Sequence, residues 1–175
     1  SPNISPRLTL SILSKLYPDL IDSKLTGFHR IVEYSNNKHS IADFLFGPGT
    51  PINEQEDTLY KANHVTEEDH LKYKYIMSID GNTAAWRRVP WIMLSNSVLV
   101  KQESNKMQWF YSAMKPYVHY VPVNERLTDI FPILDWMKTH DEELKQISAN
   151  AQNFVRNNLM PEHIDAHSVI ILNEY

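Results

Sequence analysis

The stretch that most constrains the fold of this chain is residues 72–101, which read KYKYIMSIDGNTAAWRRVPWIMLSNSVLVK. Residues 73–79 are strand-like, and the turn signal Asp80-Gly81-Asn82 follows them. The segment that opens at Thr83 is interpreted as a helix, and a second short strand is predicted at 97–100. A strand, a tight glycine-containing turn, a helix and a strand in this order form one βαβ unit.

The turn of this unit is a candidate anion site. The first N–H groups of a helix have no partner inside the helix, and they suit a phosphate group. Arg87 and Arg88 lie one turn into the predicted helix and could add a bidentate donor. Two plainer interpretations stay open: Asp80-Gly81 is also an ordinary turn, and arginine pairs on helices are commonly solvated. A single glycine is a weaker signal than a complete phosphate-binding fingerprint.

Composition narrows the class of protein. The 175 residues are 42% hydrophobic and 22% charged, enough for one domain with a core. A net charge of −4 without a basic run argues against a nucleic-acid partner. The chain has no cysteine, which excludes disulfides, thiolate metal sites and thiol catalysis and favours a reducing compartment. No stretch reaches the ~18 apolar residues of a transmembrane segment. We therefore expect a cytoplasmic location, including peripheral attachment at the inner membrane.

The remaining chain alternates between helical and strand-like segments. A helix should begin at Pro6, after Ser5 as its N-cap. Residues 117–123 alternate like a strand, which Pro122 demotes to a sheet edge or a strand end. Two more helices should be capped by Asp129 and Asp141. Further expectations are a strand at 29–34, an irregular loop at 47–57 and a last helix at 164–175. This alternation predicts an α/β fold with a largely parallel sheet.

Metal and nucleophile motifs are missing from the sequence. The eight histidines form no H-E-x-x-H motif, and His163 and His167 would need a third ligand to hold a metal ion. No Asp-x-Asp occurs, although a Mg²⁺-assisted diphosphate site would need closely placed carboxylates. We therefore expect no metal and no other cofactor, and no nucleophilic hydrolysis is indicated.

Two further features could contact a ligand. Lys101 and Glu103 lie at the carboxyl end of the second strand, where open α/β sheets place ligand-binding groups. The Glu103 carboxylate could accept hydrogen bonds from ribose hydroxyls, or it could be an exposed loop acid. The aromatic residues at 109–111, with Trp86, Trp91 and Tyr120, could stack on a base or simply fill the core.

Three blocks in order, KYKYIMSIDGNTAAWRR, LSNSVLVKQES and QWFYSAMKPYVHYVPV, carry a family resemblance. Residues 71–123 resemble the glycosyltransferase family that includes capsule-associated proteins, lipopolysaccharide-modifying transferases and protein O-glucosyltransferases. The likeness is looser over residues 5–27 and the C-terminal helices. It implies a GT-B architecture, in which two Rossmann-like domains face each other and the C-terminal one holds a nucleotide-sugar donor, typically UDP-linked. The resemblance also implies that the sugar is transferred without a metal ion.

The resemblance also implies roles for single residues. Arg87 takes the place of the arginine that clamps the donor diphosphate and stabilises the leaving group. Arg7 stands where the family often has an arginine near the donor cleft, and Asp80 stands where relatives carry a basic residue. The turn and helix start that approach the phosphates are Gly81, Asn82, Thr83, Ala85 and Trp86.

The expected organisation follows from the same resemblance. Residues 1–175 would be one Rossmann-like, three-layer donor-binding domain, the C-terminal half of a GT-B enzyme, with helices from 128–175 packed on it. The acceptor domain and its general base would be absent from this chain, so the chain alone would transfer little or no sugar. The parent protein would transfer a sugar from a UDP-sugar to a glycan acceptor, and lipopolysaccharide or capsule is the expected acceptor. The alternatives are an inactive nucleotide-binding module or a protein-interaction module of the same fold.

Overall fold

The computed structural model describes residues 5–23, 65–81, 83–85, 87–165 and 169. The chain divides into two compact units, Ser1–Thr66 and Glu67–Tyr175. In the first unit, helix α1 spans Pro6–Leu16 and begins after Ser5, as predicted. Proline suits a first helical turn because its missing N–H would have no partner there. The strand expected at 29–34 and the loop at 47–57 lie outside the described residues, and the single domain over 1–175 stays a prediction.

The second unit contains a parallel sheet of three strands in the order β1-β2-β3. The strands are β1 (Tyr75–Ser78), β2 (Val98–Gln102) and β3 (Val121–Val123). Every residue of β2 is buried, which explains its continuous apolar start. The predicted α/β fold with a parallel sheet is confirmed for the described residues.

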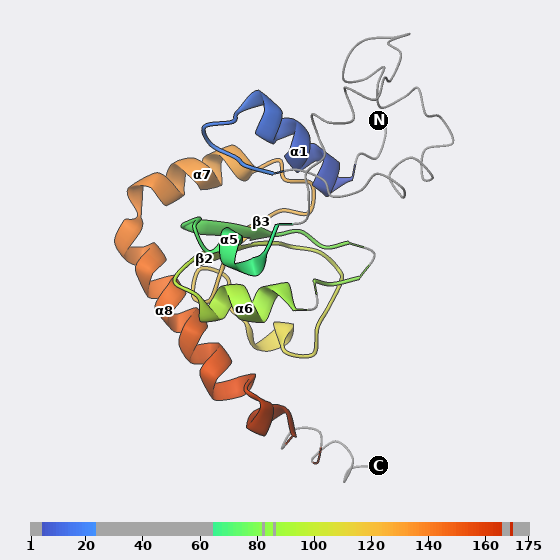
Figure 1. The fold of residues 1–175 in the computed structure, drawn as a ribbon, viewed down its shortest axis with the longest axis vertical. Coiled ribbons are helices and arrows are strands. Elements are labelled where there is room, and N and C mark those ends of the chain that lie inside the picture. Colours follow the sequence, from blue (N-terminus) through green and yellow to red (C-terminus); the bar gives the residue numbers. More distant parts are fainter. Residues whose placement is uncertain (1–4, 24–64, 82, 86, 166–168, 170–175) are drawn as a thin grey trace, which may run out of the picture. The chain divides into compact units, whose positions relative to one another are not determined.

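Helices surround this sheet. They are α5 (Glu67–His70), α6 (Arg88–Leu94), the 3-10 turn Tyr111–Ala113, α7 (Ile130–Thr139) and α8 (Asp141–Asn158). Residues of α6 and α8 share a core with the sheet, including Ile92, Val155 and Leu99. On the opposite face of β1, the Tyr75 hydroxyl donates to the carbonyl oxygen of Met137 in α7 at 3.4 Å. Figure 1 shows α6 and α7 on opposite sides of the strands, a three-layer arrangement.

The helix after β1 begins later than predicted. The sequence suggested a start at Thr83, but α6 begins at Arg88. Pro90 explains the difference, because a proline inside a helix removes a hydrogen bond and clashes with the carbonyl group four residues earlier. Pro90 is therefore accommodated in the first turn of α6 and would have kinked a helix that began at Thr83. Arg87 is the N-cap residue, so the prediction that it lies one turn into the helix is wrong.

The strand predicted at 117–123 is shorter than expected. Tyr117 has a φ of 57°, in the left-handed region, and its N–H donates to the carbonyl oxygen of Tyr120 at 2.8 Å. This tight turn breaks the extended conformation, so only Val121–Val123 pairs with β2. Asp141 also opens α8 rather than capping it, because His140 is the N-cap residue. In the part of the chain that the structure describes, no helix is long and apolar enough to cross a membrane.

Candidate functional site

The candidate site lies where the three strands end. Their carboxyl ends meet at one edge because the strands are parallel and adjacent. Asp80 and Gly81 follow β1, Glu103 and Ser104 follow β2, and Glu125 lies just beyond β3. This edge therefore gathers polar groups from segments that are far apart in the sequence.

The carboxylate of Asp80 ties two of these segments together. Its Oδ1 accepts the backbone N–H of Ala85 at 2.9 Å, and its Oδ2 accepts the hydroxyl of Ser104 at 2.5 Å. The Ser104 Oγ also accepts the backbone N–H of Lys106 at 3.2 Å. Both ends of the 80–85 segment are thus held by one side chain, with support from the loop after β2.

Gln102 and Lys106 add bonds to the same turn. The Gln102 Oε1 accepts the backbone N–H of Asp80 at 3.0 Å, while its Nε2 donates to the carbonyl oxygen of Glu125 at 2.7 Å. The Lys106 Nζ donates to the carbonyl oxygen of Gly81. Lys106 therefore places an ammonium group directly on the glycine turn.

Lys101 is a buried cation beside this network. The residue is 7% exposed, and its Nζ donates to the carbonyl oxygen of Gln102 at 3.0 Å. The Nζ also lies 4.4 Å from the ring centroid of Tyr111 and 5.9 Å from that of Tyr120, as cation–π contacts. Burial lowers the pKa of Lys101, and the negative charges of Asp80 and Glu103 oppose this shift. The two aromatic rings and the carbonyl oxygen thus offset part of the free-energy cost of burying the ammonium group.

The two tyrosines around Lys101 are kept in their phenol form. Burial raises the pKa of Tyr111, with a further contribution from Asp80, and burial and Glu103 raise the pKa of Tyr120. The Tyr111 hydroxyl lies 3.5 Å from the carbonyl oxygen of Ala85. These rings belong to the core, as does Phe110, so the core interpretation holds for them.

Arg87 is exposed at the start of α6. Its side chain is 87% exposed, and its Nη2 lies 3.5 Å from Oε1 of Glu67, whose side chain is 56% exposed. Exposed ion pairs of this kind contribute only about 0–1 kcal/mol, so Glu67 does not lock the guanidinium group in place. Arg87 as the diphosphate clamp stays a prediction.

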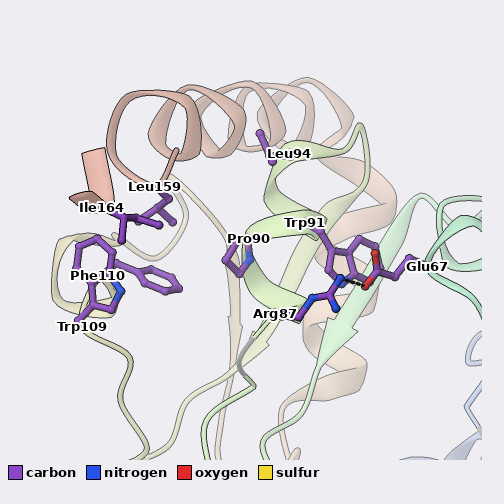
Figure 2. Close-up of a pocket in the computed structure, with 9 residues that line it drawn as sticks. All are labelled: Glu67, Arg87, Pro90, Trp91, Leu94, Trp109, Phe110, Leu159 and Ile164. Atoms are coloured by element: carbon purple, nitrogen blue, oxygen red, sulfur yellow. Dashed lines mark ion pairs between the residues drawn. The ribbon is translucent and has the colours of Figure 1, made fainter. Parts of the chain in front are cut away.

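Arg87 and Glu67 also border an open pocket of about 330 Å³ along α6. Figure 2 shows this pair beside Trp91 at one end of the pocket and Trp109 at the other. The remaining lining residues are Pro90, Leu94, Phe110, Leu159 and Ile164. Besides Arg87, the lining contains three of the aromatic residues that could stack on a base, Trp91, Trp109 and Phe110. It contains neither Asp80 nor Gly81 nor Lys106, so the pocket is not the site at the glycine turn.

The other predicted site residues have different surroundings. The N–H of Gly81 donates to the carbonyl oxygen of Thr83 at 3.1 Å, and the N–H of Ala85 is bonded to Asp80. The expectation of free amides at these two positions is therefore wrong, because the turn satisfies them internally. The Thr83 hydroxyl donates to the carbonyl oxygen of Ala84 at 3.4 Å. Glu103 is exposed, and its own N–H donates to Val123 at 2.8 Å.

Three predicted residues have no described place in the site. Asn82 and Trp86 lie outside the described residues. Arg7 lies in the first turn of α1, in the first unit, so its predicted place near the donor cleft stays a prediction. Of the histidine pair, His167 is also outside the described residues, and the described ranges contain no group of three potential metal ligands.

Sequence reasoning missed the residues that build the turn. Asp80 was noted as a turn residue and as a departure from relatives, and Gln102 only by its place between Lys101 and Glu103, while Ser104 and Lys106 were not singled out. The usable signal was their position: each lies at or just after the carboxyl end of neighbouring strands, where parallel sheets concentrate function. Polar residues at the carboxyl ends of parallel strands therefore indicate a binding site as much as a glycine motif does.

In the comparison with known proteins, the family model and the named relatives agree on one family. The family model described as glycosyl transferase family 90 matches residues 1–175. Mouse protein O-glucosyltransferase 3 is 36% identical over 169 residues, covering 97% of this chain and 29% of the relative. Human protein O-glucosyltransferase 1 is 29% identical over 177 residues, covering 100% of this chain and 39% of the relative.

A viral relative extends this set. The uncharacterized protein 035R of invertebrate iridescent virus 3 is 30% identical over 168 residues, covering 95% of this chain and 14% of that protein. The chain thus spans well under half the length of each of these relatives. The match over its whole length shows that the chain belongs to glycosyl transferase family 90.

Proposed function

We propose that the parent protein transfers a sugar from a UDP-sugar and that this chain carries its donor-binding part. The observation that carries this proposal is the match of the family model to all 175 residues. The parallel sheet supports it, because ligands of open α/β sheets bind outside the carboxyl ends of the strands. In this proposal, the donor diphosphate lies against the Gly81 turn, and the general base and the acceptor site belong to another part of the protein.

The proposed chemistry uses positive side chains. Glycosyl transfer builds negative charge on the departing diphosphate, and groups that stabilise this charge most strongly in the transition state accelerate the reaction. Arg87 is accessible for this role, and Lys106 places a second cation on the turn. Glu103, exposed at the end of β2, is proposed to accept hydrogen bonds from the ribose hydroxyls.

The proposed acceptor is a protein hydroxyl. A lipopolysaccharide or capsular acceptor was expected from the sequence, but the relatives named above are protein O-glucosyltransferases. Their names favour glucose as the sugar and protein as the acceptor class. A transfer assay with the full-length protein and UDP-glucose should therefore label a protein acceptor rather than lipopolysaccharide.

The Arg87→Ala variant tests the proposed role of the clamp. Loss of a charge-assisted hydrogen bond worth about 1.5–3 kcal/mol should lower turnover by about one to two orders of magnitude. Arg156→Ala is the matched control, because Arg156 is an exposed arginine in α8 that hydrogen-bonds to Gln152. Turnover of Arg87→Ala within a few-fold of wild type would refute Arg87 as the clamp. UDP binding without transfer to any acceptor would instead favour an inactive nucleotide-binding module.

A further inference from the structure

The segment between β1 and α6 has an unusual need for hydrogen bonds. The described residues among 79–87 belong to neither a strand nor a helix, yet Ala84 is buried and Asp80 and Ala85 are half-buried. Backbone N–H groups in such a segment must find partners, since an unpaired buried N–H is costly. Side chains provide the partners of the Asp80 and Ala85 N–H groups, and the carbonyl oxygen of Thr83 provides that of Gly81.

Asp80 occupies the centre of this arrangement. Its carboxylate closes the segment on itself through the Ala85 N–H and fastens it to the next loop through the Ser104 hydroxyl. Its own backbone N–H is held by the side chain of Gln102, which in turn donates to Glu125 beyond β3. Residues after all three strands are thus connected through Asp80 and Gln102.

The orientation of Asp80 separates its role from that of a ligand contact. Both carboxylate oxygens are occupied by protein donors, so neither needs a ligand. A carboxylate that faced a diphosphate would repel it, whereas one turned toward its own loop can hold the cationic and backbone groups around the ligand. Lys106, bonded to the Gly81 carbonyl oxygen, and Ser104 belong to the same short loop. The bond from Ser104 to Asp80 therefore also fixes where Lys106 sits.

We propose that Asp80 is a positioning residue of the donor site, whose carboxylate holds the Gly81 turn and the Ser104–Lys106 loop in the shape that receives the donor diphosphate. This inference rests on the proposed donor-binding function. Ser104 and Gln102 act through Asp80 and the turn, not on the donor.

The test compares hydrogen exchange with kinetics in the full-length protein. The variants are Asp80→Ala, Asp80→Asn and Ser104→Ala, and Asp135→Ala is the control because Asp135 is an acid in α7 whose side chain is 75% exposed. Without donor, amide exchange in a peptide covering residues 79–87 should be about tenfold faster in Asp80→Ala than in wild type. The KM for UDP-sugar should rise about tenfold, while the KM for the acceptor stays unchanged.

Two variants make the result specific. Asp80→Asn keeps one oxygen acceptor, so its exchange rate and donor KM should lie between those of wild type and Asp80→Ala. Ser104→Ala should have a smaller effect alone and add little in the Asp80→Ala background, because the hydroxyl acts through the carboxylate. If Asp80→Ala does not fold, these two variants still test the inference.

Each other outcome has a definite meaning. Amide exchange at residues 79–87 of Asp80→Ala that equals that of wild type overturns the positioning role. If Asp80→Ala does not fold, wild-type exchange rates in both Asp80→Asn and Ser104→Ala overturn it instead. Faster exchange with an unchanged donor KM also overturns it, and so does an equal rise of donor and acceptor KM, which would indicate general destabilisation. If the wild-type protein neither binds nor uses UDP-sugars, the proposed function itself is overturned. The exchange rates at residues 79–87 are measured without donor, so they report on the turn independently of that function.

Discussion

At the residue scale, Lys106 combines a charge with a fixed position. Its ammonium group is bonded to the Gly81 carbonyl oxygen, and its backbone N–H is bonded to Ser104. A cation held in this way can approach a diphosphate without first losing much side-chain freedom. It is thus the most direct partner to Arg87 in the proposed site.

The Lys106→Met variant should weaken UDP binding by about tenfold, because one charge-assisted contact to the diphosphate is lost. Binding of uridine, which lacks the phosphates, should change little. Titration calorimetry of the full-length protein with both ligands provides the measurement. Lys138→Met is a control, since Lys138 forms an exposed pair with Asp135 in α7. Equal weakening for UDP and uridine would argue against a phosphate contact.

Lys101 should give the protein a distinctive dependence on pH. Because burial lowers the pKa of Lys101 below its ordinary 10.5, the folded state binds fewer protons than the unfolded state between these two values. Wild-type stability therefore rises with pH in that window, each unit of pKa difference being worth about 1.4 kcal/mol.

The Lys101→Met variant should lack this rise. The free energy of unfolding of the variant relative to wild type should therefore fall as the pH is raised from 7 towards 10.5. Urea unfolding at several pH values measures this difference, and the exposed Lys138→Met variant should show none. A difference for Lys101→Met that does not vary with pH would contradict the account of its burial.

Single residues also explain which parts of the site were predictable. The turn at Asp80-Gly81 was visible because glycine after a strand marks a turn. Pro90 was equally visible and its effect on the helix start was overlooked. The bonds from Asp80 to Ser104 and from Lys106 to Gly81 join segments more than 20 residues apart, and no local pattern reports such contacts.

At the scale of elements, α8 supports the sheet through the turn that precedes β2. Gln152 in α8 donates through Nε2 to the carbonyl oxygen of Ser95 at 2.9 Å and to Oδ1 of Asn96 at 3.2 Å. These bonds cap the end of α6, where Ser95 is the C-cap residue. Helix α8 therefore holds the connection between α6 and β2.

The Gln152→Ala variant should lower the free energy of unfolding by about 1 kcal/mol, the usual contribution of a hydrogen bond. Gln146→Ala is the matched control, because Gln146 is an exposed glutamine of α8 that donates to Asn150 within the same helix. Thermal unfolding of both variants measures the effect. Equal stability of the two would show that the Gln152 bonds do not hold the turn.

The elements that were predicted well have strong local signals. The strand at 75–78 and the start of the strand at 98–102, predicted at 97–100, lie in largely apolar runs, and α7 and α8 follow the helical period. The strand at 121–123 was predicted too long, because the left-handed conformation of Tyr117 has no signature in a tyrosine residue. Local backbone hydrogen bonds to the carbonyl oxygens of Lys115 and Tyr120 stabilise that turn.

At the scale of the whole molecule, family membership makes the reaction class testable without knowing the acceptor. Positive side chains are proposed to neutralise the diphosphate, so transfer should proceed without a divalent cation. Activity of the full-length protein in excess EDTA should stay within about twofold of that without EDTA. A loss that Mn²⁺ or Mg²⁺ restores would refute the metal-independent mechanism.

The GT-B arrangement and the general base are expectations at this same scale. Both expectations concern parts of the parent protein outside this chain, which spans 29% of mouse protein O-glucosyltransferase 3. The family resemblance over residues 71–123 pointed to the family, which the match over 1–175 confirmed. It also suggested a lipopolysaccharide or capsular acceptor, which the named relatives do not favour.

The most direct measurement is an experimental structure of the full-length protein with UDP bound. We expect the diphosphate at the carboxyl edge of the sheet, with its oxygens within hydrogen-bond distance of the Arg87 guanidinium group and the Lys106 ammonium group, against the turn at Gly81. A diphosphate bound elsewhere, with Arg87 still paired to Glu67, would contradict the assignment of the donor site.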